Sequence, residues 1–254
     1  MRKTQVLKAL HNAIQNDSLD VFLQPLIDTS NGNIIAAEAL VRINDNTLGL
    51  IPPDEFITMA EENGYIKQLG EQVLNKVCIF LHHLRNKHNL KWINVNLSPI
   101  QCLDSNLLET INSIVDKNNV DHSLIHLEIT EECIIDLDIL KTQMDKLIDN
   151  GYNISLDDFG SGFSNLSLIK ALPFNNIKLD MSIVRGHFAS PDVMLPGIVE
   201  TFIKKGLSVT AEGIENSEMR ETFENMGVTY LQAYCFSKPI PMYEFYDLMQ
   251  KDCM

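Results

Sequence analysis

The chain has 254 residues, a hydrophobic fraction of 45% and a formal net charge of −14. This acidic balance disfavours non-specific binding to a DNA or RNA polymer or to an anionic membrane surface, because like charges repel. The five cysteines are scattered without a CxxC pair or zinc-ligand spacing, which is typical of a reducing compartment and predicts a cytoplasmic protein.

The N-terminal region predicts a helix followed by a hairpin. Apolar residues recur at helical spacing within residues 1–18, which we expect to form an entry helix. No signal-peptide pattern occurs here, and no stretch approaches the ~20 apolar residues of a membrane span. Strands are expected at 21–27 and 34–43, joined by an Asn-Gly reversal that makes them antiparallel. Pro25 indicates an edge or a specialised position in the first of them.

The rest of the chain predicts alternating helices and strands. Helices are expected at about 53–63, 66–88, 104–118, 136–150, 164–171, 191–205, 217–226 and 241–250, and strands at 92–98, 124–130, 153–159, 176–180, 207–214 and 230–234. This alternation indicates a parallel sheet with crossover helices. Eight strands in ~250 residues predict an α/β fold, a (β/α)8 TIM-type barrel with one antiparallel strand near the N-terminus. We expect a single domain over 1–254, and an open doubly wound sheet is the alternative.

Most predicted strands carry a polar residue inside or at the end of an apolar run. These residues are Glu38, Asn96, Glu128, Asp157, Asp158, Lys178, Glu212 and Gln232. Taken singly, each is also explained as a solvent-facing residue, a turn former, a helix cap or a salt-bridge partner. In a barrel the C-terminal strand ends meet at one mouth, so we expect the set to converge there.

The composition of this set indicates its chemistry. Converging carboxylates repel one another and recruit cations, and oxygen-only ligands favour Mg²⁺ or Mn²⁺ over zinc. Asp157 and Asp158 are adjacent and suit a pair of metals that acts in phosphoryl displacement. Lys178 would orient the attacking water or offset charge, and Glu212 would take its proton. A Mg²⁺-dependent lyase or enolising barrel with Lys178 as the base remains an alternative on these residues alone.

At these positions the sequence resembles the EAL domain family of bacterial cyclic di-GMP phosphodiesterases. The resemblance runs from about residue 5 to 248 and rests on an ordered series of motifs. They are Gln24-Pro25, Glu38-Ala39-Leu40-Val41-Arg42, Asn96-Leu97-Ser98, Glu128-Ile129-Thr130-Glu131, the loop from Leu156 to Leu166, Lys178-Leu179-Asp180, the run from Ala211 to Glu215, and the segment from Gln232 to Pro239. The family fold is a barrel with one antiparallel strand, in agreement with the hairpin.

The resemblance implies hydrolysis of cyclic di-GMP to linear pGpG with two metal ions, Mg²⁺ or Mn²⁺, per active site. One metal would be held by Glu38, Asn96, Glu128 and Asp157, and the second by Asp157 and Asp158. Catalytic roles fall to Glu212, Lys178, Gln232 and Glu131, of which Glu131 would anchor the loop after Asp158. Substrate contacts fall to Gln24, Leu40, Arg42, Asp180 and Glu215. The guanidinium of Arg42 suits a phosphate because its fork grips two oxygens.

The sequence departs from the family pattern at two positions. Ala233 replaces the usual glycine after Gln232, and Asn165 replaces a small residue in the loop.

Members of the family often pair through the region corresponding to 159–171, which implies a homodimer. The chain reads as a domain that stands alone or is cut from a larger protein. Members with damaged sites act as cyclic di-GMP receptors or protein-binding regulators, and that function is the rival to catalysis.

Overall fold

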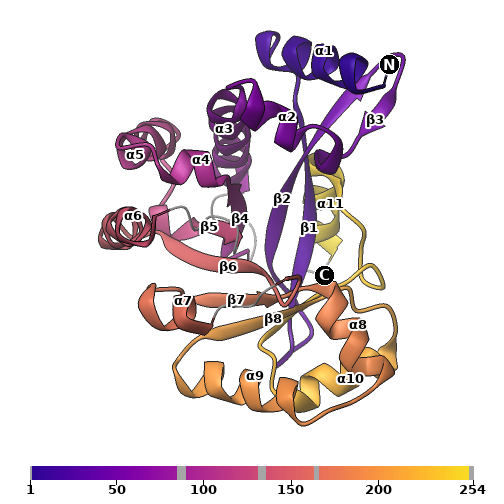
Figure 1. Ribbon diagram of the computed structural model, residues 1–254. Helices are drawn as coiled ribbons and strands as arrows, with labels where there is room; N and C mark the ends of the chain where they lie inside the picture. Colours follow the sequence, from indigo (N-terminus) through magenta and orange to yellow (C-terminus); the bar gives the residue numbers. More distant parts are fainter. Residues whose placement is uncertain (1, 85–89, 131–135, 163–165, 252–254) are drawn as a thin grey trace.

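The computed structural model describes residues 2–84, 90–130, 136–162 and 166–251. Eight strands form a closed barrel (Figure 1). In order around the barrel they are β1 (Asp20–Asp28), β2 (Ile34–Asp45), β4 (Trp92–Leu97), β5 (Ile125–Thr130), β6 (Asn153–Phe159), β7 (Asn176–Leu179), β8 (Ser208–Glu212) and β9 (Tyr230–Gln232). β1 pairs antiparallel with both β2 and β9, and the remaining neighbours pair in parallel. The predicted barrel with one reversed strand is confirmed, and the open sheet is excluded.

Two short strands extend the barrel and were not predicted. β3 (Gly49–Ile51) pairs with the end of β2, and β10 (Ile240–Pro241) pairs with the start of β1. Pro25 lies opposite Ala37 of β2, while β10 pairs only up to Leu23 and β9 only from Leu26. On the side of β1 opposite β2, the proline therefore lies between the segment that pairs with β10 and the segment that pairs with β9. This is the predicted specialised position, and β1 is not an edge strand.

Helices cover the outside of the barrel (Figure 1). They are α1 (Arg2–Gln15), α2 (Ile57–Glu62), α3 (Ile66–Leu84), α4 (Pro99–Cys102), α5 (Leu107–Lys117), α6 (Leu137–Asp149), α7 (Leu166–Ala171), α8 (Met181–Ala189), α9 (Met194–Lys204), α10 (Ser217–Met226) and α11 (Met242–Lys251), with short 3₁₀ helices η1 (Pro53–Glu55) and η2 (His122–Leu124). α4 and α8 were not predicted. In the described part of the chain, no helix combines the length and apolar character that crossing a membrane requires.

α8 begins directly after β7 because Asp180 is its N-cap. The Asp180 carboxylate accepts hydrogen bonds from the Ser182 backbone N–H, at 2.8 Å, and from the Ser182 hydroxyl. The predicted strand 176–180 was therefore one residue too long, and α8 lies in a segment for which no helix was predicted.

Strand alternation places apolar side chains outside the barrel and polar ones inside it. In β7, Ile177 and Leu179 are fully buried in the outer layer of apolar residues, and Lys178 between them is 1% exposed. Asn94, Ser155 and Thr210 are also buried. The barrel interior is therefore polar, and charged groups inside it depend on one another for stabilisation.

Aromatic rings lie inside the barrel at the N-terminal ends of the parallel strands. Trp92 stacks on His126 with ring centroids 4.6 Å apart, and Tyr230 meets Trp92 edge-on at 5.3 Å. β4 and β9 are not neighbours in the sheet, so the Trp92–Tyr230 contact crosses the barrel interior. Burial lowers the pKa of His126 to about 3, and this floor is therefore uncharged at neutral pH.

Candidate active site

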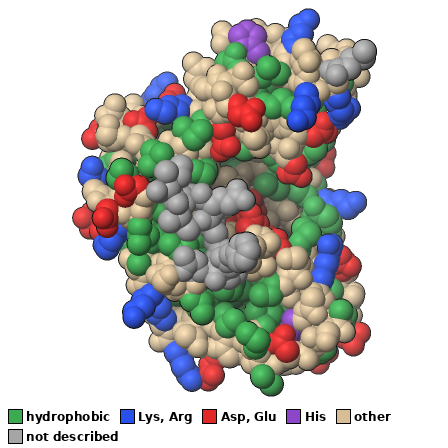
Figure 2. Space-filling view, viewed as in Figure 1, with side chains coloured by type: hydrophobic (Ala, Val, Ile, Leu, Met, Phe, Trp, Pro, Cys, Tyr) green, Lys and Arg blue, Asp and Glu red, His purple; other side chains and the backbone are tan. Residues whose placement is uncertain are grey.

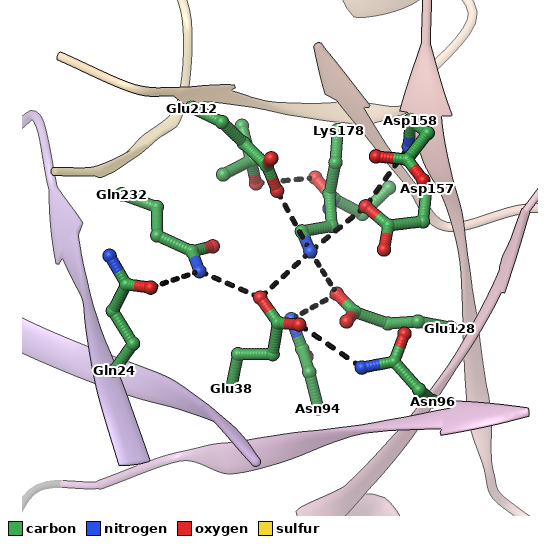
Figure 3. Close-up of polar contacts among 12 residues, drawn as sticks. Gln24, Glu38, Asn94, Asn96, Glu128, Asp157, Asp158, Lys178, Glu212 and Gln232 are labelled. Carbon is green, nitrogen blue, oxygen red and sulfur yellow. Dashed lines mark hydrogen bonds and ion pairs between the residues drawn. The ribbon is translucent and has the colours of Figure 1, made fainter. Parts of the chain in front are cut away.

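The predicted polar residues converge in the barrel mouth. The space-filling view shows a hollow near the centre of one face, with acidic side chains inside it (Figure 2). Glu38, Glu128, Asp157, Asp158, Lys178, Glu212, Asn96, Gln24 and Gln232 lie around a single point, and together they come from all eight barrel strands (Figure 3). The convergence expected for eight of them is confirmed, and Gln24, predicted as a substrate contact, lies beside them.

Lys178 is the centre of the cluster. Its Nζ atom lies 3.0 Å from Glu38 Oε2, 3.0 Å from Glu128 Oε1, 2.9 Å from Asp157 Oδ1 and 2.9 Å from Glu212 Oε1 (Figure 3). Burial alone would lower the pKa of Lys178, but the surrounding carboxylates raise it well above its usual range. One ammonium faces four carboxyl groups, so full ionisation of the site would leave an excess of negative charge.

Glu38 is held at both carboxylate oxygens. Gln232 Nε2 donates to Oε2 at 2.7 Å, and Asn96 Nδ2 donates to Oε1 at 3.0 Å. Burial acts to raise the pKa of Glu38, but Lys178 and these two amides hold it below the usual value. Because Asn96 donates through nitrogen, its amide oxygen stays available as a ligand. Gln232 Nε2 also donates to Gln24 Oε1 at 3.2 Å, which fixes the orientation of both amides.

Among the described contacts, Glu128 is bound at one of its two oxygens. Asn94 Nδ2 donates to Oε1 at 2.6 Å, and Lys178 contacts the same atom. Oε2 is buried and has no hydrogen-bond partner among the described residues. Burial, together with the charges of Glu38 and Asp157, raises the pKa of Glu128 well above its usual value despite Lys178. Sequence reasoning missed Asn94, although it shares the inner face of β4 with Asn96.

Asp157 and Asp158 both reach the site although they are adjacent in sequence. β6 loses regular register with β7 between Leu156 and Phe159, and Asp158 has a φ of 57°. Burial and the charge of Asp157 raise the pKa of Asp158 to about 6. Burial and the charge of Glu38 likewise raise the pKa of Asp157, against the effect of Lys178.

Glu212 has the properties of a group poised to accept a proton. Burial is the main cause that raises its pKa to about 8, with added repulsion from Asp157 and Glu38. The contact with Lys178 opposes this shift but does not cancel it. A carboxyl that titrates close to neutral pH matches the requirement for general acid–base work.

The predicted substrate residues lie around the mouth in different settings. Leu40 lines a cleft of about 510 Å³ together with Glu38, Asp157 and Asp158. Arg42 is half-buried, with its guanidinium 5.8 Å from the centre of the Phe22 ring and Nη1 donating to the Val41 carbonyl. Burial lowers the pKa of Arg42.

The other predicted contacts border a smaller hollow on the far side of Gln232. Gln24, Glu212 and Glu215 line it, and Glu215 pairs with Arg185 there. Asp180 lies nearby as the α8 cap. Glu131, the predicted loop anchor, lies outside the described residues.

The donor set fits divalent cations that prefer oxygen ligands. Glu38, Glu128 and Asp157 offer oxygens within 4.8 Å of one another, as do Asp157, Asp158 and Glu212. Asp157 belongs to both groups, so it can bridge two ions. Bound cations would satisfy the buried Oε2 of Glu128, which has no partner among the described residues, and would offset the excess of carboxyl groups over ammonium.

A closed (β/α)8 barrel with a carboxylate-rich mouth around a buried lysine defines the class of protein. The chain belongs to the EAL domain family, because the family model matches residues 7–239.

Two curated relatives and two solved structures show the extent of the similarity. The chain is 34% identical over 239 residues to PdeR of Escherichia coli, a cyclic di-GMP phosphodiesterase, covering 93% of this chain and 36% of PdeR. It is 31% identical over 241 residues to MucR of Pseudomonas aeruginosa, a bifunctional diguanylate cyclase/cyclic di-GMP phosphodiesterase, covering 93% of this chain and 35% of MucR. The chain thus spans about a third of the length of these relatives.

The solved structures agree over nearly the whole chain. A complex of the MucR phosphodiesterase with cyclic di-GMP superimposes with a TM-score of 0.88 at 31% identity, covering 95% of this chain and 99% of that chain. The EAL enzyme Bd1971, bound to cAMP and cyclic di-GMP, gives a TM-score of 0.91 at 28% identity, covering 98% of this chain and 69% of that chain.

Proposed function

We propose that the chain hydrolyses one phosphodiester of cyclic di-GMP to give linear pGpG. The observation that carries the proposal is the set of four carboxylates around Lys178, three of them buried, in a barrel of the EAL family. The names of MucR and PdeR support the reaction, and the MucR complex supports the substrate.

Two divalent cations, Mg²⁺ or Mn²⁺, would be held by the cluster. Glu38, Glu128, Asp157 and the amide oxygen of Asn96 would bind the first, and Asp157 and Asp158 the second. When bound, such cations supply Lewis acidity, which polarises the phosphodiester and acidifies water.

The remaining residues of the cluster prepare the attack on phosphorus. Glu212 accepts the proton of the attacking water, in keeping with its raised pKa. Lys178 holds four carboxylates in fixed positions and offsets part of their repulsion. Gln232 bridges Glu38 and Gln24, so it links the carboxylate cluster to the substrate side of the mouth. Glu131 is proposed to anchor the loop after Asp158.

The cleft beside the cluster has the size expected of a small-molecule site. Its volume of about 510 Å³ lies within the ~300–1,000 Å³ typical of ligand pockets. Arg42 would bind a phosphate of the dinucleotide, and Leu40 would contact it across the apolar wall of the cleft. Gln24, Asp180 and Glu215 would contact it on the opposite side of Gln232.

A cyclic di-GMP receptor without turnover is the rival function. The retention of every described carboxylate, the lysine and the glutamine favours the enzyme. A lyase with Lys178 as base is disfavoured, because four carboxylates keep this ammonium protonated and the pKa of Lys178 well above its usual value.

The decisive assay incubates purified protein with cyclic di-GMP and either Mg²⁺ or Mn²⁺, and measures pGpG by chromatography. We expect turnover, its loss on chelation, and its abolition in Glu38→Ala. Glu200→Ala is the matched control, because Glu200 pairs with Lys204 on the exposed face of α9. Binding of cyclic di-GMP without any turnover in metal-replete buffer would replace the enzyme with the receptor.

We further propose a homodimer through the 159–171 region and a cytoplasmic location. Leu166 at the start of α7 is 54% exposed, an apolar side chain available for such a contact. The free thiols of Cys78 and Cys235 suit a reducing compartment. Sedimentation of the wild type and of Leu166→Glu tests the dimer. An unchanged sedimentation coefficient would move the interface elsewhere.

A further inference from the structure

A second layer of polar side chains lies directly below the carboxylate cluster. Its members are Asn94, Ser155, Asn176 and Thr210, which precede Asn96, Asp157, Lys178 and Glu212 by two positions. On a strand, residues two apart share a face, so these side chains also point into the barrel. All of them are buried.

Asn176 links two members of this layer to each other and to the residue below. Its Oδ1 accepts hydrogen bonds from Thr210 Oγ1 at 3.2 Å and from Ser208 Oγ at 3.0 Å, and Ser208 precedes Thr210 by two positions. Asn94 instead reaches upward and donates from Nδ2 to Glu128 Oε1 at 2.6 Å (Figure 3). Asn94 thus connects the layer to a carboxylate of the site.

In the described contacts, Glu128 receives one side-chain amide donor, from Asn94, whereas Glu38 receives two. Lys178 contacts all four carboxylates, so it does not select one of them. Glu38 receives amide donors from Gln232 and Asn96, and Asp157 receives the backbone N–H of Asp158. The uncharged donor to Glu128 is Asn94.

The two oxygens of Glu128 consequently differ. Asn94 and Lys178 both bind Oε1, whereas Oε2 is buried without a partner among the described residues. With Oε1 held, the carboxylate cannot rotate to exchange its oxygens without breaking a short hydrogen bond.

We propose that Asn94 is a positioning residue, which holds Glu128 Oε1 and thereby presents Oε2 as the oxygen that ligates a divalent cation. The inference rests on the metal requirement of the proposed function and deepens it. Groups that orient a ligand in this way typically contribute ~10–100-fold in metal affinity.

The test measures Mn²⁺ binding by calorimetry in the absence of substrate. Asn94→Leu has a similar size and lacks the donor, and we expect its Kd for Mn²⁺ to rise ~10–100-fold. The Mn²⁺ concentration for half-maximal turnover should rise in parallel. At saturating Mn²⁺, kcat and the KM for cyclic di-GMP should return to wild-type values, which a general structural defect would not allow.

Thr210→Val is the matched control, since it removes a buried hydroxyl of the same layer that bonds only to Asn176 in the described contacts. It should bind Mn²⁺ as the wild type does. Asn94→Ala is the second variant if Asn94→Leu does not fold. A wild-type Kd in a folded Asn94 variant would overturn the inference. If the wild type binds Mn²⁺ but does not hydrolyse cyclic di-GMP, the proposed function is refuted. The positioning of Glu128 by Asn94 is then still tested by the Mn²⁺ Kd alone.

Discussion

The backbone N–H of Asp158 donates a hydrogen bond to the Oδ1 atom of Asp157 at 3.0 Å. On a regular strand these adjacent side chains would point to opposite faces. The left-handed φ of Asp158, 57°, and the irregular register of β6 bring both carboxylates into one mouth. The aspartate pair is therefore created by a local break in the strand.

This geometry predicts different outcomes for two substitutions of Asp158. Asp158→Asn tolerates the left-handed backbone but removes a charge, so turnover should fall ~100-fold or more while the metal-free Tm is retained or raised. Asp158→Ala should lose turnover and also ~1–2 kcal/mol of unfolding free energy. Assays with Mn²⁺ and thermal unfolding check both. Full activity in Asp158→Asn would remove this residue from the metal site.

Lys178 is expected to stabilise the fold as well as the site. Lys178→Met leaves four carboxyl groups, three of them buried, without their cation, and breaking a buried pair typically costs ~3–5 kcal/mol. Denaturant unfolding of the metal-free protein at neutral pH measures this loss, and added Mn²⁺ should recover part of it. Lys67→Met is the control, because its ion pair with Asp104 is exposed and surface pairs contribute ~0–1 kcal/mol. Equal losses in both variants would contradict the central role of Lys178.

The raised pKa of Glu212 sets the pH dependence of metal-free stability. The folded state binds this proton more tightly than the unfolded state between the ordinary value of 4.5 and about 8. The contribution of Glu212 to stability must therefore fall as pH rises through that window and level off above it. Thermal unfolding in a chelator should show this decline, and Glu212→Gln should make it shallower between about pH 6 and about pH 8, because the raised pKa of Glu128 adds a decline of its own. A wild-type Tm that rises across this range would show that Glu212 is ionised when the protein folds.

Gly213, directly after Glu212, is predicted to be intolerant of a side chain. Its φ is +68°, and a Cβ there would lie 2.6 Å from Met181 Cβ in the first turn of α8. Gly213→Ala should therefore displace α8 and cost ~1–3 kcal/mol beyond the backbone strain. Gly206→Ala is the control, because it has a similar φ of +86° with open space around it. Comparable Tm losses in the two variants would indicate that strain alone matters.

The sequence was sufficient for the barrel and for most of the site because both follow from periodicity. Alternation along strands placed Glu38, Glu128, Lys178 and Glu212 on the inner face, and the parallel barrel brought them to one end. Such reasoning needs no knowledge of side-chain contacts.

Other features could not be read from periodicity. Asp180 ends a strand pattern but acts as a helix cap, so α8 was missed. Asn94 sits in an apolar strand like any interior polar residue, and only its contact with Glu128 distinguishes it. The bulge at Asp158 depends on the register between β6 and β7, which is a long-range property.

The rings of Trp92, His126 and Tyr230 pack against one another inside the barrel, at the end opposite the mouth. We therefore expect a cation that reaches Glu128 to arrive through the mouth, past the place where the dinucleotide would bind. Loading would then be ordered, with metal first and nucleotide second, and a bound nucleotide would slow metal exchange. Chelator added before the substrate and chelator added after it would inactivate the protein at different rates.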